Sequence, residues 1–315
     1  MLTMIFHRKK NVKRLAVLDR LIHAGHFSRA AGLGLFLLAL VLLFLSPLLD
    51  LVIYAATSKL YSFILLVPFV SLYLAWPRVR ELASNLGSSP KLALIPLLIG
   101  ILLINGYYSI VRFGATVNQN DYLSFTIYAF VAFVASGCFM FLGRKGAAVV
   151  AFPIAFLFLM APLPTFVTDF ARDYLQHASA ATAYLLLRLL GMPVLREGPV
   201  FQLPGMTIEV APQCSGIHST LVLFIMSLVA GHLLLKNTRN RVMLALAMVV
   251  IGILRNGVRI VTISMLCVYV DPGMIDSPVH HHGGPLFLVL SLVPFFLLLL
   301  WLRRSEHGMR EGQPS

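Results

Sequence analysis

The chain contains about eight long apolar stretches, several of which run for roughly 20 residues with few charged side chains. The hydrocarbon core of a bilayer is ~30 Å thick, so a stretch of about 20 apolar residues can cross it as a helix. The hydrophobic fraction of 59% also exceeds the ~45–50% of a typical soluble domain. The sequence therefore predicts an all-α polytopic membrane protein. We expect spans at about 32–56, 59–77, 91–111, 122–143, 147–165, 217–235, 242–270 and 285–302.

The basic residues are concentrated in the termini and in short connections between these stretches. If the N-terminus is cytoplasmic, about eight crossings place the basic connections on the cytoplasmic side, as the positive-inside rule requires. The residues concerned are Arg78, Arg80, Lys91, Arg144, Lys145, Lys236, Arg239, Arg241, Arg303 and Arg304. Topology and contact with anionic membrane lipids thus account for the net charge of +13, and no nucleic-acid partner is expected. We predict a plasma (inner) membrane protein with both termini in the cytoplasm.

The same pattern divides the chain into a basic cytoplasmic leader at 1–30, a single integral membrane domain at 31–302 and a cytoplasmic tail at 303–315. The segment 166–192 carries four charged or titratable residues in its first half, and the apolar run that follows is too short to span a membrane. We interpret it as an amphipathic helix at the outer interface. Residues 200–210 alternate around a Pro-Gly pair, which predicts a short hairpin.

Cys214 lies in the stretch "APQCSGIHST", immediately before an apolar run, and the predicted topology puts it at the outer interface. Ser215 and Gly216 can begin a helix there, and the positive end of that helix favours the reactive thiolate. His218 follows four residues after the cysteine and is a competing proton carrier. The other two cysteines lie inside apolar runs and are expected to be inert.

Three polar residues interrupt the apolar stretch 242–270, within "ILRNGVRIVTIS": Arg255, Asn256 and Arg259. An arginine near the bilayer centre costs at least ~2.5–3.5 kcal/mol on insertion, so such residues are functional candidates. Their spacing places all three on one helical face. A structural arginine bonded to carbonyls at a kink is the alternative. Neither neighbouring span contains an acidic residue, so the cations would favour a thiolate or a substrate anion.

Three histidines precede the last span in "VHHHGGPLF". Histidine carries protons at neutral pH, and with a cysteine and an arginine it completes a nucleophile, a proton carrier and an oxyanion stabiliser. Metal binding by the tract is the alternative. Adjacent histidines converge poorly on one ion and no carboxylate or cysteine stands at ligand spacing, so we expect neither a metal ion nor another cofactor.

The motifs "APQCSGIHS", "RNGVRIV" and "VHHHGGPLF", in this order, resemble those of the exosortase/archaeosortase family. The resemblance covers most of residues 50–300, with a catalytic half at about 145–302. It implies a membrane cysteine transpeptidase in which Cys214 is the nucleophile, Arg259 stabilises the oxyanion and His280 moves protons. His280 and Gly284 fit the family's spacing of histidine and glycine, and His281 is the alternative. The implied supporting or substrate-contacting residues are Ser215, Gly216, His218, Arg255, Asn256, His281 and Gly284.

The resemblance also implies the partners, which are exported proteins with a C-terminal motif, a membrane span and a basic tail. Cleavage at the outer interface would form a thioester that an acceptor resolves; the acceptor is not specified by the sequence. Two departures from the family pattern are Phe63 after Tyr61 and Ser62, where relatives often carry histidine, and His218, where many carry arginine. The alternatives are an intramembrane cysteine protease that uses water and an anion transporter that uses Arg255 and Arg259.

Overall fold

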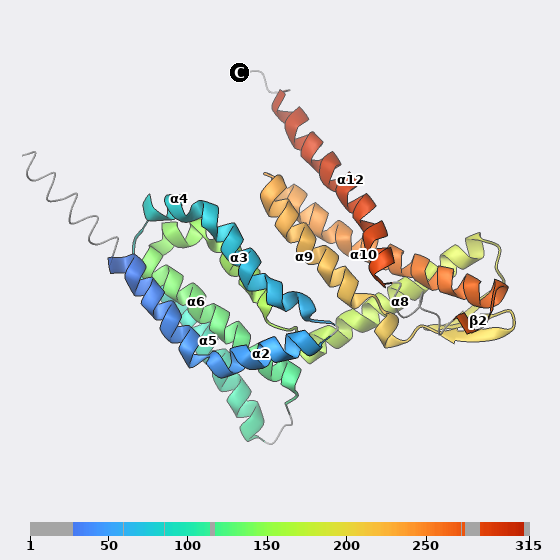
Figure 1. Ribbon diagram of the computed structural model, residues 1–315, viewed down its shortest axis with the longest axis horizontal. Helices are drawn as coiled ribbons and strands as arrows, with labels where there is room; N and C mark the ends of the chain where they lie inside the picture. Colours follow the sequence, from blue (N-terminus) through green and yellow to red (C-terminus); the bar gives the residue numbers. More distant parts are fainter. Residues whose placement is uncertain are drawn as a thin grey trace, which may run out of the picture. The chain divides into compact units, whose positions relative to one another are not determined.

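The computed structural model describes residues 28–58, 60–84, 86–113, 117–271, 273–274 and 284–311. These residues form helices and one small sheet (Figure 1). The chain divides into two compact units, one ending at Thr165 and the other beginning at Phe166. Each unit is helical through most of its length, as the apolar stretches predict.

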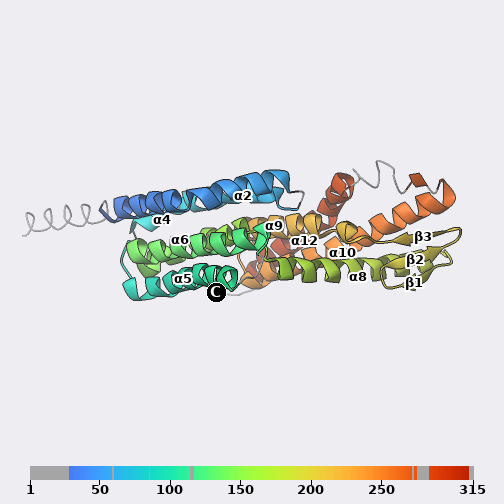
Figure 2. The same ribbon diagram turned by 90° about the horizontal axis from the view of Figure 1, so that it is seen from below.

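The first unit consists of helices of very different length. Two of them, α5 and α6, lie side by side (Figure 2). Gly100 permits this approach, since a Cβ there would lie 2.6 Å from the ring of Phe133. The elements of this unit are the helix Ser28–Leu43, α2 (Leu45–Thr57), η1 (Ser62–Leu66), α3 (Val67–Ala75), η2 (Trp76–Arg78), α4 (Val79–Ser84), α5 (Pro90–Arg112), α6 (Gln119–Val149), α7 (Ala151–Leu157) and η3 (Phe158–Met160).

Two polar side chains at the start of α6 form hydrogen bonds with the backbone of the last residues of the first unit. Asn120 donates from Nδ2 to the carbonyl of Leu163 at 2.7 Å, and Asp121 accepts from the amide of Thr165 at 2.6 Å. Thr165 is the first residue of α8 (Thr165–Leu189), so the Asp121 carboxylate satisfies an amide that a helix leaves without an internal partner. These bonds fix the chain where the second unit begins.

The second unit combines four long helices with a three-stranded antiparallel sheet. The strands β1 (Leu195–Glu197), β2 (Val200–Leu203) and β3 (Met206–Glu209) follow α8 directly. The hairpin predicted at 200–210 is confirmed as β2 and β3, joined at Pro204 and Gly205, where glycine adopts a φ of 79°. The third strand, β1, was not predicted. The remaining elements are η4 (Pro212–Cys214), α9 (Ile217–Leu234), α10 (Thr238–Tyr269) and α12 (Gly284–Glu311).

The core of this unit joins the sheet to two helices. Phe201 and Ile208 from the strands pack with Ala183 and Leu187 of α8 and with Ile260 of α10. A second cluster joins α9, α10 and α12 through Leu223, Leu244, Met248, Phe295 and Leu299. The sheet is therefore anchored on the half of α10 that carries the predicted polar face.

Five of the eight predicted spans correspond to single helices of the described residues: 91–111, 122–143, 217–235, 242–270 and 285–302. The span expected at 32–56 is a bent helix pair, and the one expected at 147–165 forms only the short α7 and η3. Five helices are long and apolar enough to cross a membrane, and up to seven spans result if each pair separated by a short break is one span. The stretch expected at 59–77 forms the shorter apolar helix Ser62–Arg78. The chain is thus an all-α polytopic membrane protein with a small added sheet. The basic leader predicted at 1–30 falls almost wholly outside the described residues.

Candidate active site

Cys214 ends a short 3₁₀ turn between the sheet and α9. Its amide donates to the carbonyl of Ala211 at 2.8 Å, and the amide of Ser215 donates to Pro212 at 3.2 Å. Gly216 then adopts a φ of 78° and caps α9, which begins at Ile217. The prediction that this stretch opens the helix is confirmed for Gly216, whereas Ser215 is the C-cap of the preceding 3₁₀ turn. The thiol therefore lies just ahead of the positive end of the α9 dipole.

Asn256 of α10 holds this turn in place. Its Nδ2 donates to the carbonyl of Cys214 at 2.9 Å, and the residue is only 1% exposed. Gly216 packs directly on the same side chain, because a Cβ at Gly216 would lie 2.8 Å from Cγ of Asn256. The backbone of the cysteine turn is thus fixed to α10 by one hydrogen bond and one close contact.

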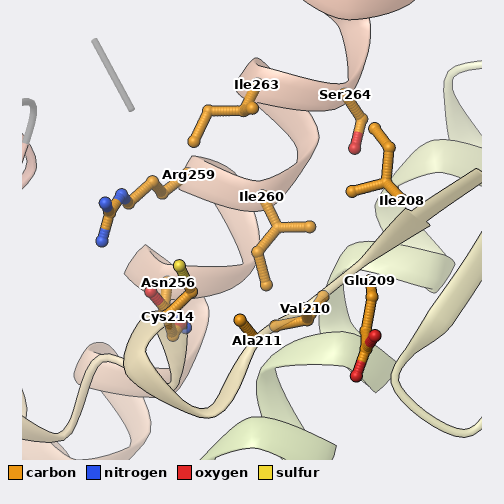
Figure 3. Close-up of a pocket in the computed structure, with 10 residues that line it drawn as sticks. All are labelled: Ile208, Glu209, Val210, Ala211, Cys214, Asn256, Arg259, Ile260, Ile263 and Ser264. Atoms are coloured by element: carbon orange, nitrogen blue, oxygen red, sulfur yellow. The ribbon is translucent and has the colours of Figure 1, made fainter. Parts of the chain in front are cut away.

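A pocket of about 200 Å³ opens beside Cys214. Figure 3 shows Cys214, Asn256 and Arg259 on one side of the pocket, whereas the carboxylate of Glu209 points away from the sulfur. Most of the remaining wall is apolar. The residues that line the pocket are Ile208, Glu209, Val210, Ala211, Cys214, Asn256, Arg259, Ile260, Ile263 and Ser264. A half-buried thiol and a guanidinium therefore face a common space with little water-accessible polar surface.

The three polar residues of α10 border two different cavities. Asn256 and Arg259 line the cysteine pocket, whereas Arg255 lines a different cavity between α10 and α12. Arg255 still reaches the cysteine turn, since its Nη2 would lie 3.1 Å from a Cβ at Gly216. Arg255 and Arg259 lie about one turn apart, ~6 Å along the axis of α10, and each borders its own cavity.

The remaining predicted site residues fall into two groups, those that the structure describes and those that it does not. Ser215 is 1% exposed, and among the described residues its hydroxyl has no hydrogen-bond partner. His218 lies half-buried in the first turn of α9, and Gly284 is the first residue of α12. His280 and His281 fall outside the described residues. In the described ranges, no group of three His, Cys, Asp or Glu residues could hold a metal ion.

The sequence prediction missed residues that shape the pocket. Gln176 of α8 is buried and donates to the carbonyl of Val210 at 2.6 Å, which fixes the strand end next to the cysteine turn. Ile260 and Ile263 continue the helical face of Asn256, so the spacing along α10 could have identified them. Nothing in the local sequence of Gln176 or Val210 indicates that they meet.

Substitution of Gly216 by alanine is expected to lower both stability and activity. A residue other than glycine at this φ costs ~1–3 kcal/mol, and the new methyl group would also displace Asn256 from the Cys214 carbonyl. Thermal unfolding in detergent and processing of an exported substrate in cells measure the two effects. Gly205→Ala is the matched control, since Gly205 has a φ of 79° but no atom within 4 Å of its added Cβ. Equal losses of stability and activity in both variants would show that the contact between Gly216 and Asn256 has no special role.

A family model described as transmembrane exosortase matches residues 55–297, which is most of the chain. The matched region contains the cysteine turn, its pocket and the start of α12. No curated protein and no solved structure matches the chain significantly. The resemblance of the three sequence motifs is therefore confirmed at the level of the family. The chain belongs to the transmembrane exosortases, a family of multi-pass, membrane-embedded transpeptidases that act on the sorting signals of exported proteins.

Proposed function

We propose that this protein is a cysteine transpeptidase that cleaves a C-terminal sorting signal at the outer interface of the plasma (inner) membrane. The observation that carries the proposal is the pocket shared by Cys214 and Arg259. A thiolate supplies the nucleophile of acyl transfer, and a guanidinium stabilises the oxyanion that the attack creates. The apolar walls around them limit competition from water.

The proposed reaction begins with attack of the Cys214 thiolate on a peptide carbonyl carbon. The carbonyl π electrons move to oxygen, and Arg259 stabilises the resulting oxyanion. When the tetrahedral intermediate collapses, the C–N bond breaks and the amine leaves with a proton from His280. The acyl group remains on sulfur as a thioester, which an amine or hydroxyl acceptor resolves while His280 takes its proton. His281 is the alternative proton carrier.

Asn256, Gly216 and Ser215 act in this proposal by positioning the nucleophile. The hydrogen bond from Asn256 to the Cys214 carbonyl fixes the turn, and Gly216 allows the close approach to α10. The α9 dipole favours negative charge at the cysteine. His218 lies in the first turn of the same helix and is a secondary proton carrier next to the thiol.

The distribution of charge in the second unit supports an outward-facing site. Glu306 accepts from the amides of Lys236 and Asn237, so the end of α12 meets the connection between α9 and α10. The basic residues Lys236, Arg239, Arg241, Arg303 and Arg304 lie around these elements. Cys214 lies at the opposite end of α9, whose 18 residues span ~27 Å. With the basic end cytoplasmic, as the positive-inside rule requires, Cys214 faces outward.

The composition of α8 supports an interfacial location for that helix. Phe166, Phe170 and Tyr174 are exposed at intervals of four residues and therefore share one face. Aromatic side chains are enriched at membrane–water interfaces. With α8 in the outer interface, a substrate with a membrane span and a basic tail would present its scissile bond near Cys214.

The thioester is the intermediate that tests the proposal. The reporter is an exported protein that carries a candidate signal, a membrane span and a basic tail. We expect mass spectrometry of the enzyme isolated from cells with this reporter to find an acyl adduct on Cys214. Hydroxylamine should remove this adduct, because it cleaves thioesters. Product with an added acceptor indicates transfer, and product with a free carboxylate indicates the hydrolytic alternative. Cleaved reporter without any adduct on Cys214, even after rapid quenching, would reject the covalent mechanism.

A further inference from the structure

A second cavity of the second unit encloses about 330 Å³ between α10 and α12. It shares no lining residue with the cysteine pocket. Arg255 is the one charged residue among the described residues that line it. Ser291 is the other polar one, and its hydroxyl already donates to the carbonyl of Phe287 at 2.7 Å. The apolar wall consists of Ile251, Leu254, Val258, Phe287, Leu290, Val293 and Pro294. We call this cavity the α10–α12 groove.

Arg255 brings an uncompensated charge to the groove. The residue is 7% exposed, and its Nε and Nη2 have no hydrogen-bond partner within the described part of the chain. A buried guanidinium is strongly destabilising unless an anion or hydrogen-bond acceptors compensate it. In the described residues of α9 and α10 there is no acidic side chain. The groove therefore has the electrostatic character of an anion site that no described acidic residue of α9, α10 or the start of α12 fills.

The nearest acidic residue of α12 does not serve this purpose. Glu306 lies 15 residues beyond Ser291, which corresponds to ~22 Å along the helix. Its carboxylate accepts from the amides of Lys236 and Asn237 and from the side chain of Asn240. Glu306 is thus committed to the opposite end of the helices.

The groove is polar at one end and apolar along the rest of its length. The Arg255 guanidinium reaches Gly216, at the end of α9 that carries Cys214. Ile251 and Pro294 lie farther along their helices, toward the end with the basic residues. Leu254, Leu290 and Val293 are at least half exposed, so the groove is accessible from the side of the helices. An anionic head above an acyl chain matches this arrangement.

We propose that the α10–α12 groove binds an anionic phospholipid, with its phosphate on Arg255 and an acyl chain along the apolar wall. A free phosphate would leave the apolar wall without a partner. An apolar membrane-spanning segment would fill the wall, but its side chains would supply no anion to Arg255. An anionic phospholipid supplies both a phosphate and an acyl chain, and the bond between guanidinium and phosphate is of the strong, charge-assisted kind.

Native mass spectrometry of the purified full-length protein with phosphatidylglycerol or phosphatidylcholine tests the site. We expect Arg255→Gln to weaken phosphatidylglycerol binding about tenfold, the effect of losing one charge-assisted hydrogen bond, and to leave phosphatidylcholine binding unchanged. Arg188→Gln is the matched control, because Arg188 lies on α8 and does not line the groove. Wild-type binding in Arg255→Gln would overturn the proposal.

A second pair of variants tests the apolar wall without altering the charge. Val258→Trp fills the groove, whereas Leu246→Trp places the same side chain at an exposed position of α10 outside it. Only the first should weaken phosphatidylglycerol binding. Glycerol phosphate without acyl chains should not compete at equal concentration, and equal competition would show a phosphate site instead of a lipid site. If Val258→Trp impairs reporter processing but not lipid binding, the groove holds the substrate span and the proposal is wrong.

Discussion

Cys214→Ala is expected to abolish processing of an exported reporter, with a loss on the order of 10³-fold or more, because in the proposed mechanism the acyl intermediate forms on its sulfur. Cys214→Ser should lose nearly as much, since a serine hydroxyl is far less ionised than a thiol at neutral pH. Cleavage of the reporter in cells, followed by electrophoresis, measures the effect. Both variants should insert in the membrane normally, because the side chain at position 214 is only half-buried and packs at the periphery of the core cluster.

The two remaining cysteines provide matched controls. Cys138 and Cys267 are buried within α6 and α10, where each acts as a small apolar side chain. Alanine at either position removes little volume, and processing should stay within a few-fold of wild type. Full processing by Cys214→Ala, or an equal loss in Cys138→Ala, would exclude Cys214 as the nucleophile.

Arg259→Gln is expected to lower kcat by ~10²–10³-fold, the usual loss when one oxyanion donor is removed. The reason is that, in the proposed mechanism, the Arg259 guanidinium acts on charge that develops only after the thiolate attacks. Arg259→Lys keeps the charge but not the planar array of donors, so it should recover only part of the rate. Steady-state kinetics with purified enzyme and a peptide reporter in detergent measure this loss.

The kinetic parameters separate this role from substrate binding. If Arg259 stabilises only the transition state, kcat and kcat/KM fall together and KM stays near its wild-type value. A rise in KM at constant kcat would instead assign Arg259 to ground-state binding of the substrate. Arg172→Gln is the control: this arginine pairs with Asp169 on an exposed part of α8 and lines neither cavity.

The membrane helices and the start of the cysteine helix follow directly from local sequence. Stretches such as 91–111 and 217–235 coincide closely with α5 (Pro90–Arg112) and α9 (Ile217–Leu234), because a bilayer leaves an apolar segment few alternatives to a helix. Gly216 marks the beginning of α9 since glycine adopts its positive φ without strain. The hairpin at 200–210 was equally predictable from its alternation and its Pro-Gly turn.

Sequence by itself thus determined the class of protein, its spans, its family motifs and Cys214 as the reactive candidate. Only the tertiary structure decided that Asn256 bonds to the Cys214 carbonyl, that Gln176 fixes Val210, and that Arg259 and Arg255 line different cavities. Hydropathy acts locally and leaves a helix free to rotate about its axis. The rotation of α10 is fixed by packing against α8, α9, α12 and the sheet, whose residues are far apart in the chain.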